Sequence, residues 1–289
     1  MKKILYILTT LLSIANVIFA QEEIKLYPNG AKESNEISVA ESYSSPGFLI
    51  NISNPRMFNF FAPKEKANGT AVLICPGGSY YGVAFEHEGV AIAKWFNELG
   101  VSAFVLYYRM PNGHTTIPLR DAQTALTIIQ KHAKEWNIDK NKIGIMGFSA
   151  GGHLASTVGT HFKSKSQRPA FMILGYPVVS MKKEVTHAFS RKNLIGENPT
   201  PELESLYSNE LQVTKNTPPT FIVHANDDKV VPVQNSILLY KALLAKKVVA
   251  EMDTFAVGGH GFGMIKHGIP VDNWSELLKK WLKTNKFIK

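Results

Sequence analysis

The sequence predicts an α/β fold, with a mostly parallel, doubly wound sheet and an antiparallel N-terminal preface. From Ala71 onward, apolar runs of strand length alternate with amphipathic stretches of helical period, which is the pattern of a parallel sheet covered on both faces. The composition, 45% apolar and 19% charged, excludes a disordered, collagen-like or coiled-coil chain. Once a predicted leader of 20 residues is removed from the 289, the remaining length suits a single domain, residues 21–289.

Residues 1–20 are predicted to be a signal peptide that is removed on export. Two lysines precede the apolar segment Ile4–Phe19, which ends at Ala20 before a polar stretch. Polar residues interrupt the apolar segment, and this favours a cleaved signal over a membrane span. No cysteine directly follows it to carry a lipid. We therefore expect a periplasmic or secreted protein without a stable membrane anchor.

The stretch Ile24–Pro63 is rich in Ser, Asn and Pro and predicts the antiparallel preface. Phe48–Ile52 and Met57–Phe61 have the composition of strands, and Ser53-Asn54-Pro55 between them predicts a turn. We expect both to be edge strands.

The remaining elements alternate along the chain. Strands are predicted at Ala71–Cys75, Ser102–Leu106, Ile143–Met146, Phe171–Leu174, Thr220–His224 and Ala250–Phe255. Helices are predicted at Glu88–Leu99, Leu119–Glu135, Gly151–Gly159, Gln234–Lys246 and Val271–Lys283. The stretch His187–Lys215 breaks the alternation and contains Gly196, Pro199 and Pro201. It predicts an irregular insertion that covers a site at the carboxyl end of the sheet.

The formal charge of +9 is spread along the chain without a nucleic-acid-binding motif, so we expect no nucleic-acid partner. Weak attraction to acidic polymers, such as uronate-bearing polysaccharides, stays open. The single cysteine, Cys75, lies inside a predicted strand and can form no internal disulfide. We predict a buried thiol, with a reactive nucleophile as the alternative. Nothing in the sequence indicates an oligomeric state.

The pentapeptide Gly147-Phe148-Ser149-Ala150-Gly151 follows a predicted strand directly and precedes a predicted helix. This is the setting of a nucleophile elbow, in which a serine lies on a sharp turn from strand to helix. The glycines leave room for the turn, and the helix N-terminus favours developing negative charge. Ser149 is therefore the candidate nucleophile.

A candidate base and a candidate acid follow in the order Ser, Asp, His. His260 lies in a glycine-rich loop after the last predicted strand, and this loop can direct the imidazole toward Ser149. Two aspartates, Asp227 and Asp228, follow the preceding strand. Asp228 is favoured because it opens a D-x-x-V-P spacing that reaches Pro232, and Asp227 stays as the alternative.

Backbone donors for an oxyanion are expected after the strand Ala71–Cys75, where a Pro-Gly-Gly-Ser-Tyr stretch begins at Pro76. Gly78 and Ser79 can each present an N–H group beside that of Ala150. A simple turn from strand to helix is the alternative.

These motifs resemble those of α/β-hydrolase carbohydrate esterases, the acetylxylan-esterase and feruloyl-esterase-like enzymes of secreted bacterial polysaccharide-degrading systems. The resemblance runs from about Phe58 to the end of the chain. It is carried by Cys75–Gly78, Gly147–Leu154, Asp227–Pro232, Gly259–Gly263, Ser190–Gly196 and Tyr207–Glu210. Ser79 departs from the family pattern, which often has a third glycine there.

The resemblance implies a secreted serine esterase that removes short acyl groups, above all acetyl, from plant polysaccharides such as xylan, without a cofactor or a metal. A feruloyl esterase, a serine exopeptidase and a non-catalytic glycan-binding relative stay open as alternatives. A lipase is disfavoured because the insertion lacks a long apolar helix.

Several further residues invite an interpretation. Tyr80 and Tyr81 are candidates to stack on a sugar or aryl ring, with packing under the loop as the alternative. We expect His153 to be structural and Arg109 to fix a loop through a buried ion pair. The run Glu86–Glu88 predicts a helix start rather than a metal site.

Overall fold

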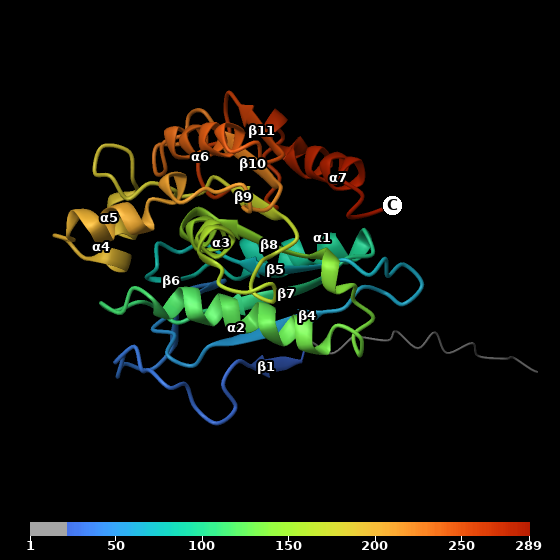
Figure 1. The fold of residues 1–289 in the computed structure, drawn as a ribbon, viewed down its shortest axis with the longest axis horizontal. Coiled ribbons are helices and arrows are strands. Elements are labelled where there is room, and N and C mark those ends of the chain that lie inside the picture. The colour runs from blue at the N-terminus through green and yellow to red at the C-terminus, as the bar shows by residue number, and fades with distance from the viewer. Residues whose placement is uncertain (1–21) are drawn as a thin grey trace, which may run out of the picture.

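The computed structural model describes residues 22–289, and the predicted signal peptide lies outside this range. An eight-stranded sheet runs through the molecule in the order β1-β4-β7-β5-β8-β9-β10-β11 (Figure 1). Its strands are β1 (Glu23–Lys25), β4 (Arg56–Phe60), β5 (Ala71–Cys75), β7 (Ser102–Tyr107), β8 (Ile143–Phe148), β9 (Met172–Gly175), β10 (Thr220–Ala225) and β11 (Ala250–Phe255). The strands β7, β5, β8, β9, β10 and β11 are parallel to one another, whereas β1 pairs with β4, and β4 with β7, in the antiparallel direction. The predicted fold class is confirmed.

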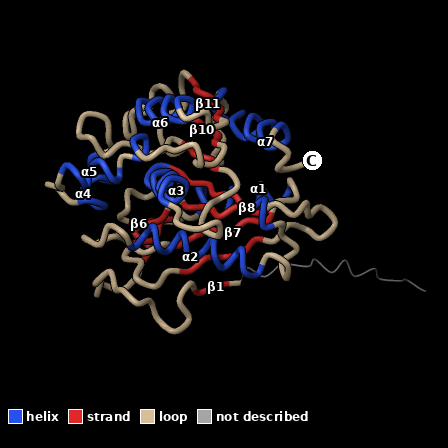
Figure 2. Tube along the Cα trace, in the orientation of Figure 1, coloured by secondary structure: helices blue, strands red, loops and turns tan. Residues whose placement is uncertain are grey.

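Helices cover both faces of the sheet (Figures 1 and 2). The chain runs from β5 through α1 (Ala91–Glu98) to β7, and then back past β5 through α2 (Ile117–His132) to β8. Because βαβ crossovers are right-handed, this reversal places α1 and α2 on opposite faces. The same rule places α3 (Ser149–His161) and α6 (Gln234–Ala245) on the face of α2. On the other face α7 (Trp274–Thr284) lies beside α1, where the rings of Trp95 and Trp274 are 6.3 Å apart.

Short helical turns lead into several of these elements. They are the π-helical turn η1 (Glu86–Val90), which includes the predicted helix start, and the 3-10 turns η2 (Lys140–Lys142) and η4 (Pro270–Asn273).

The chain reverses its direction across the sheet at the carboxyl ends of β5 and β8. The loops that follow these two strands leave toward opposite faces of the sheet, and ligands of open α/β sheets bind at such a point. Every residue of β5, β7, β8, β9 and β10 is buried, as expected for strands covered on both sides. The residues that follow these strands are therefore held by a buried sheet.

The N-terminal preface is antiparallel, as predicted, but the expectation of edge strands is wrong. β4 lies between β1 and β7 inside the large sheet. β3 (Phe48–Ile50) pairs with β2 (Ser42–Ser45) and β6 (Gly82–Val83) in a separate three-stranded sheet. The segment between β3 and β4 redirects the chain from one sheet to the other, with Asn51 at φ +61° and a proline before β4.

The insertion at residues 187–215 is helical rather than irregular, which corrects the prediction. It contains α4 (Ala188–Ile195), α5 (Pro201–Tyr207) and the turn η3 (Asn209–Leu211). Gly196, at φ +85°, ends α4. Pro201 occupies the first turn of α5 after the capping hydroxyl of Thr200. The glycine and prolines that suggested irregular structure therefore separate two short helices.

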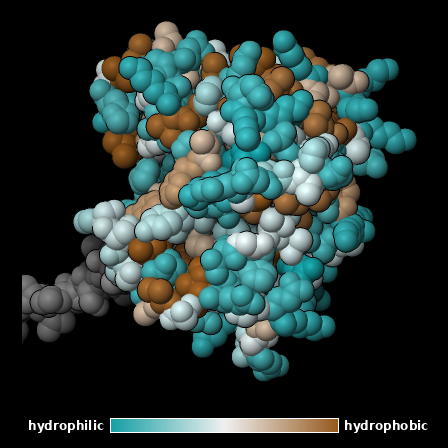
Figure 3. Space-filling model, turned by 90° about the vertical axis from the view of Figure 1, so that its left-hand side faces the viewer, coloured by the Kyte–Doolittle hydropathy of each residue, from teal (hydrophilic) through white to brown (hydrophobic). Residues whose placement is uncertain are grey.

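The insertion and β6 lie at the left of Figure 1, and Figure 3 shows this side of the molecule. Apolar side chains form several separate groups on it, with polar side chains between them (Figure 3). Within residues 22–289, no helix combines the length and the apolar character that a membrane span requires.

Candidate active site

Ser149 lies on the turn between β8 and α3, at φ +51°, a conformation that is unusual for serine. The turn is tight on both sides. A Cβ atom on Gly147 would lie 2.1 Å from the Gly151 carbonyl oxygen, and one on Gly151 would lie 2.0 Å from the Cys75 carbonyl oxygen. Both positions therefore require glycine if α3 is to start this close to β5 and β8. The turn leaves Ser149 only 5% exposed at the carboxyl end of β8.

Three side chains that follow three different strands form one chain of hydrogen bonds. Ser149 Oγ donates to His260 Nε2 at 3.0 Å, and His260 Nδ1 donates to Asp228 Oδ2 at 2.7 Å. Asp228 follows β10 and His260 follows β11. The bond to Asp228 keeps the imidazole proton on Nδ1, so that Nε2 is free to accept the proton of the serine.

Asp228 is fixed by donors on both carboxylate oxygens. Its Oδ1 atom accepts from the N–H groups of Val230 and Val231 at 2.8 and 2.9 Å. Burial alone would raise the pKa of the Asp228 carboxyl, but hydrogen bonds from His224 and His260, the charge of His260 and the Val231 N–H outweigh it. The pKa therefore lies well below its ordinary value, and the carboxylate stays ionised.

Sequence reasoning missed His224, which is fully buried on β10. Its Nε2 atom lies 2.9 Å from the Val231 carbonyl oxygen and 3.2 Å from Asp228 Oδ2, and it donates toward both. Its Nδ1 atom accepts from the Ser236 hydroxyl at 2.8 Å. The sequence did contain an indication of this role, because a buried histidine inside an apolar strand needs polar partners.

Asp227, the alternative acid, has a different position. Its Oδ1 atom accepts from the N–H groups of Gly258 and Gly259 at 2.9 and 2.8 Å. These glycines directly precede His260. Asp227 thus holds the start of the histidine loop, while Asp228 contacts the imidazole.

The loop after β5 lies against the serine. A Cβ atom on Gly77 would lie 2.9 Å from Ser149 Cβ. Within residues 22–289, the N–H groups of Gly78 and Ser79 donate to no protein acceptor. The N–H group of Ala150 belongs to the first turn of α3, where the helix itself offers no acceptor. The three predicted donors therefore lie in the two segments that meet at the serine, and they have no protein acceptor that would compete with a ligand.

A buried carboxylate, Glu88 on η1, braces this loop. Its Oε2 atom accepts from the Gly77 N–H at 2.6 Å, and its Oε1 atom accepts from the Tyr176 hydroxyl at 2.7 Å. The Tyr176 oxygen in turn accepts from the Gly263 N–H at 3.1 Å, and the Tyr176 ring packs edge-on against that of His260, with centroids 4.8 Å apart. One chain of hydrogen bonds thus joins the loop after β5 to the histidine loop.

Tyr80 and Tyr81 lie in different environments. Tyr80 is 2% exposed and its hydroxyl donates to His153 Nδ1 at 2.8 Å, so the prediction that Tyr80 stacks on a sugar or aryl ring is wrong. The left-handed backbone of the loop turns this ring inward, where it packs. Tyr81 is 47% exposed, and its ring centroid lies 5.8 Å from that of Phe189 on α4.

His153 has structural contacts, as expected. Its Nε2 atom donates to the Tyr207 carbonyl oxygen at 2.8 Å, which ties α3 to the insertion. Burial lowers the pKa of His153 to about 4, so the imidazole is neutral near pH 7.

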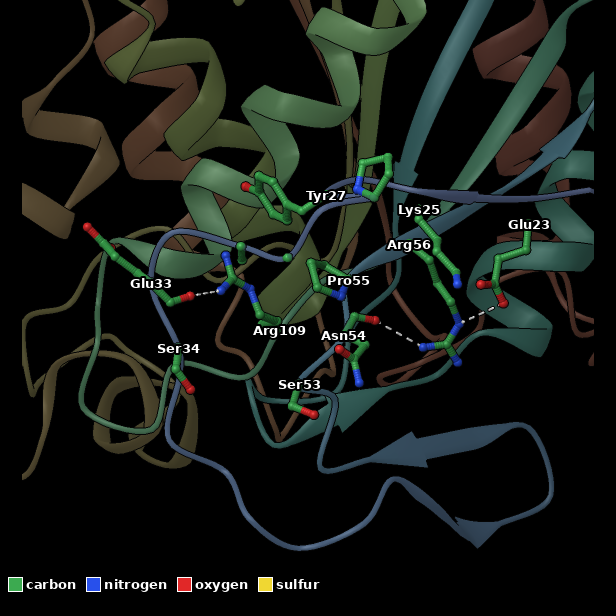
Figure 4. Close-up of a pocket in the computed structure, with 13 residues that line it drawn as sticks. Glu23, Lys25, Tyr27, Glu33, Ser34, Ser53, Asn54, Pro55, Arg56 and Arg109 are labelled. Atoms are coloured by element: carbon green, nitrogen blue, oxygen red, sulfur yellow. Dashed lines mark hydrogen bonds and ion pairs between the residues drawn. The ribbon is translucent and has the colours of Figure 1, made fainter.

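Arg109 forms the expected buried ion pair, with 2.6 Å between its Nη2 atom and Asp121 Oδ1. It also lines a cavity of about 580 Å³ below the N-terminal segment (Figure 4). In this cavity Arg109 donates to the Glu33 carbonyl oxygen, and Arg56 pairs with Glu23 at 3.5 Å (Figure 4). Both arginines of this cavity are therefore already paired, and none of Ser149, Asp228 and His260 lines it.

Cys75 is buried, and burial raises the pKa of its thiol well above the ordinary value, which does not suit a nucleophile. Among residues 22–289, no three His, Cys, Asp or Glu side chains converge in a way that could hold a metal ion.

Comparisons with known proteins add the following. Residues 58–243 match the family model described as BD-FAE. The chain is 37% identical over 250 residues to a protein of Xylanibacter ruminicola named acetylxylan esterase, a match that covers 84% of this chain and 52% of that protein. It is 36% identical over 253 residues to endo-1,4-beta-xylanase B of Butyrivibrio fibrisolvens, which covers 83% of this chain and 38% of that protein. The chain thus spans about half, or less, of the length of these curated relatives.

A solved structure is similar over nearly its whole length. The acetyl ester-xyloside bifunctional hydrolase of Caldicellulosiruptor lactoaceticus matches with a TM-score of 0.80 and 37% identity. The match covers 93% of this chain and 97% of that chain.

Proposed function

The chain belongs to the BD-FAE family and has the α/β-hydrolase fold, and on this basis we propose that it is a serine esterase that removes short acyl groups, above all acetyl, from a plant polysaccharide such as xylan. The observation that carries the proposal is the chain of hydrogen bonds from Ser149 through His260 to Asp228. The loop that carries Gly78 and Ser79 approaches the serine at Gly77, and the N–H groups of these two residues have no protein acceptor. This is the set of groups that acyl transfer needs.

The reaction proceeds in two halves. Ser149 Oγ forms a bond to the ester carbonyl carbon while its proton moves to His260 Nε2, and the N–H groups of Gly78, Ser79 and Ala150 stabilise the negative charge on the carbonyl oxygen. The bond to the sugar oxygen then breaks, and His260 returns the proton to that oxygen. A water molecule attacks the acyl-serine with His260 again as the base, which releases the carboxylic acid and restores Ser149. Asp228 orients the imidazole and stabilises its charged form.

Support for a carbohydrate substrate comes from the names of the relatives, which are acetylxylan esterase, endo-1,4-beta-xylanase B and acetyl ester-xyloside bifunctional hydrolase. These names describe those proteins, and we extend them to this chain because the similarity spans most of its length. A small acyl group suits the low exposure of Ser149, 5%.

A feruloyl esterase is the second candidate. One observation favours it, namely that the partly exposed rings of Tyr81 and Phe189 form an aromatic surface beside the Gly78 loop. An aryl acyl group could pack there.

We also propose that the protein acts in the periplasm or outside the cell after the loss of residues 1–20. The lysine-flanked apolar segment of the sequence supports this. N-terminal sequencing of the protein from the periplasmic fraction and the medium should give a chain that begins at Gln21. A cytoplasmic protein that retains Met1 would contradict the proposal.

The activity is tested by acetate release from acetylated xylo-oligosaccharides, with methyl ferulate as a parallel substrate and Ser149→Ala as the control. We expect acetate release by the wild type and none above background in the variant. Hydrolysis of methyl ferulate alone would establish the second candidate instead. Equal inactivity of the folded wild type and variant toward both substrates would contradict an esterase of either kind.

A further inference from the structure

A second cavity, of about 360 Å³, borders the loop that follows β5. This volume lies at the lower end of the range of small-molecule sites, roughly 300–1,000 Å³. The cavity is built from segments that are far apart in the sequence, namely the N-terminal segment, the loop after β3, the loop after β5, the loop after β7, and α4. Its lining residues are Glu36, Ile37, Ser38, Val39, Asn51, Tyr80, Tyr81, Met110, Asn112 and Asn193.

The cavity and the candidate active site share the loop that follows β5. Ser79 and Tyr80 have φ values of +59° and +56°, and this left-handed run is followed at once by Tyr81, whose ring is partly exposed. Asn193 Nδ2 donates to the Ser79 carbonyl oxygen at 2.8 Å, which fixes the same peptide segment from α4. One short loop therefore carries the Gly78 and Ser79 N–H groups of the candidate active site and, directly after them, the Tyr80 and Tyr81 residues that line this cavity.

Three asparagine side chains in the lining each donate their amide N–H group to a backbone carbonyl oxygen of the protein. The Nδ2 atom of Asn193 donates to Ser79, that of Asn112 donates to the Asn35 carbonyl oxygen at 2.8 Å, and that of Asn51 donates to the Ala40 carbonyl oxygen at 3.4 Å. Within residues 22–289, the Oδ1 atoms of these three amides accept no hydrogen bond. The cavity therefore offers acceptors, and acceptors recognise a ligand that is rich in hydroxyl donors.

The charge of the lining excludes one class of sugar. The cavity contains the carboxylate of Glu36 and no lysine or arginine. The Glu36 carboxylate lies 3.7 Å from His114 Nε2, but the lining itself holds no lysine or arginine that could pair with a second carboxylate. An acidic sugar would therefore meet acceptor oxygens and a like charge. The net positive charge of the chain, +9, suggested attraction to uronate-bearing polymers, but that charge lies elsewhere.

We propose that this cavity is a binding subsite for a neutral sugar residue in the alcohol part of the ester, with one face of the pyranose stacked on Tyr81 and its hydroxyls donating to the free oxygens of Asn112 and Asn193. In the acetyl esters that we favour as substrates, the acyl group is too small to fill the cavity, so the sugar occupies it. The inference rests on the proposed esterase function and specifies the substrate of the same site.

The test compares two substrates in Tyr81→Ala. The measured quantity is the ratio of kcat/KM for acetylated neutral xylo-oligosaccharides to kcat/KM for 4-nitrophenyl acetate, which has no sugar to place in the cavity. We expect this ratio to fall about tenfold, mainly through KM of the oligosaccharide. Tyr43→Ala is the matched control, since Tyr43 is exposed on β2 and does not line the cavity, and its ratio should stay at the wild-type value. Asn112→Gly is a second variant, because glycine accepts the φ of +46° at this position while the acceptor is lost.

Measuring sugar binding in a variant that lacks Ser149 tests the proposed subsite separately from the proposed esterase activity. Ser149→Ala should bind unacylated xylotetraose in calorimetry, and Tyr81→Ala in the same background should weaken this binding by about tenfold. If the wild type hydrolyses no ester but xylotetraose binding still depends on Tyr81, the esterase proposal fails and the subsite stands. An unchanged substrate ratio and unchanged binding in the Tyr81 and Asn112 variants would overturn the subsite. Tighter binding of a xylo-oligosaccharide that carries glucuronic acid than of xylotetraose would overturn its preference for neutral sugars.

Discussion

Replacing Tyr176 with phenylalanine removes one hydroxyl from the chain of hydrogen bonds that joins the two loops of the site. That hydroxyl donates to Glu88 Oε1 at 2.7 Å and accepts from the Gly263 N–H at 3.1 Å. Without it, a buried carboxylate oxygen and a buried N–H group each lose a partner. An unsatisfied buried group costs about 1–3 kcal/mol, so the loss of a partner by two groups should lower the free energy of unfolding by about 2–6 kcal/mol. The ring of Tyr176 should stay against His260, because phenylalanine keeps its apolar contacts.

The assay is urea unfolding of Tyr176→Phe, combined with kcat and KM on 4-nitrophenyl acetate. Because the lost bonds position the Gly77 peptide and the histidine loop, kcat should fall about tenfold or more while KM changes little. Tyr43→Phe, at an exposed position, is the control and should stay within about 0.5 kcal/mol of the wild type. A Tyr176→Phe protein as stable and as active as the wild type would refute the role that we give to this chain of bonds.

The remaining predictions concern the acid, the buried histidine and the elbow. Asp228→Asn should lower kcat/KM on 4-nitrophenyl acetate by about 10⁴-fold, because the amide no longer holds the correct tautomer of the imidazole, whereas Asp227→Asn should cost less than tenfold. The opposite ranking would make Asp227 the acid. Burial lowers the pKa of His153 to about 4 in the folded protein, against 6.5 in the unfolded chain, so the unfolded state binds more protons between these values. The free energy of unfolding should therefore fall as the pH drops from 6.5 toward 4. At pH 5, the change of this free energy with pH should be smaller in His153→Gln than in the wild type, by the amount that corresponds to about one bound proton. Urea titrations that give the same pH dependence for both proteins would contradict this assignment. Gly151→Ala should lower the free energy of unfolding by about 3 kcal/mol, since the added Cβ atom would lie 2.0 Å from the Cys75 carbonyl oxygen. A thermal unfolding midpoint equal to that of the wild type would show that the turn at Ser149 is less tight than described.

The sequence predicted the structure correctly at positions where only one physical reason explains the residue type. Gly147 and Gly151 flank a serine because any larger side chain would meet backbone atoms, so this motif marked the turn correctly. The buried parallel strands were readable as apolar runs because both of their faces are covered. The two aspartates could be ranked from their spacing to a proline, and the structure places Asp228 against the imidazole.

The features of the fold and of the site that the sequence did not predict depend on contacts between distant parts of the chain. Glu88 and Tyr176 are 88 positions apart, and no local pattern distinguishes a buried acid on η1 from an exposed one at a helix start. Tyr80 and Tyr81 are neighbours of the same type, and only the backbone of the loop decides which ring is buried. The preface was misjudged because strand composition does not say which sheet a strand joins.

Labelling with a fluorophosphonate tests whether Ser149 is a nucleophile that His260 activates. We expect one adduct on the wild type, located by peptide mass spectrometry at Ser149, and a labelling rate at least about 10³-fold lower in a folded His260→Ala variant. A folded wild-type protein that takes up no label, or takes it up on another serine, would show that Ser149 is not the nucleophile.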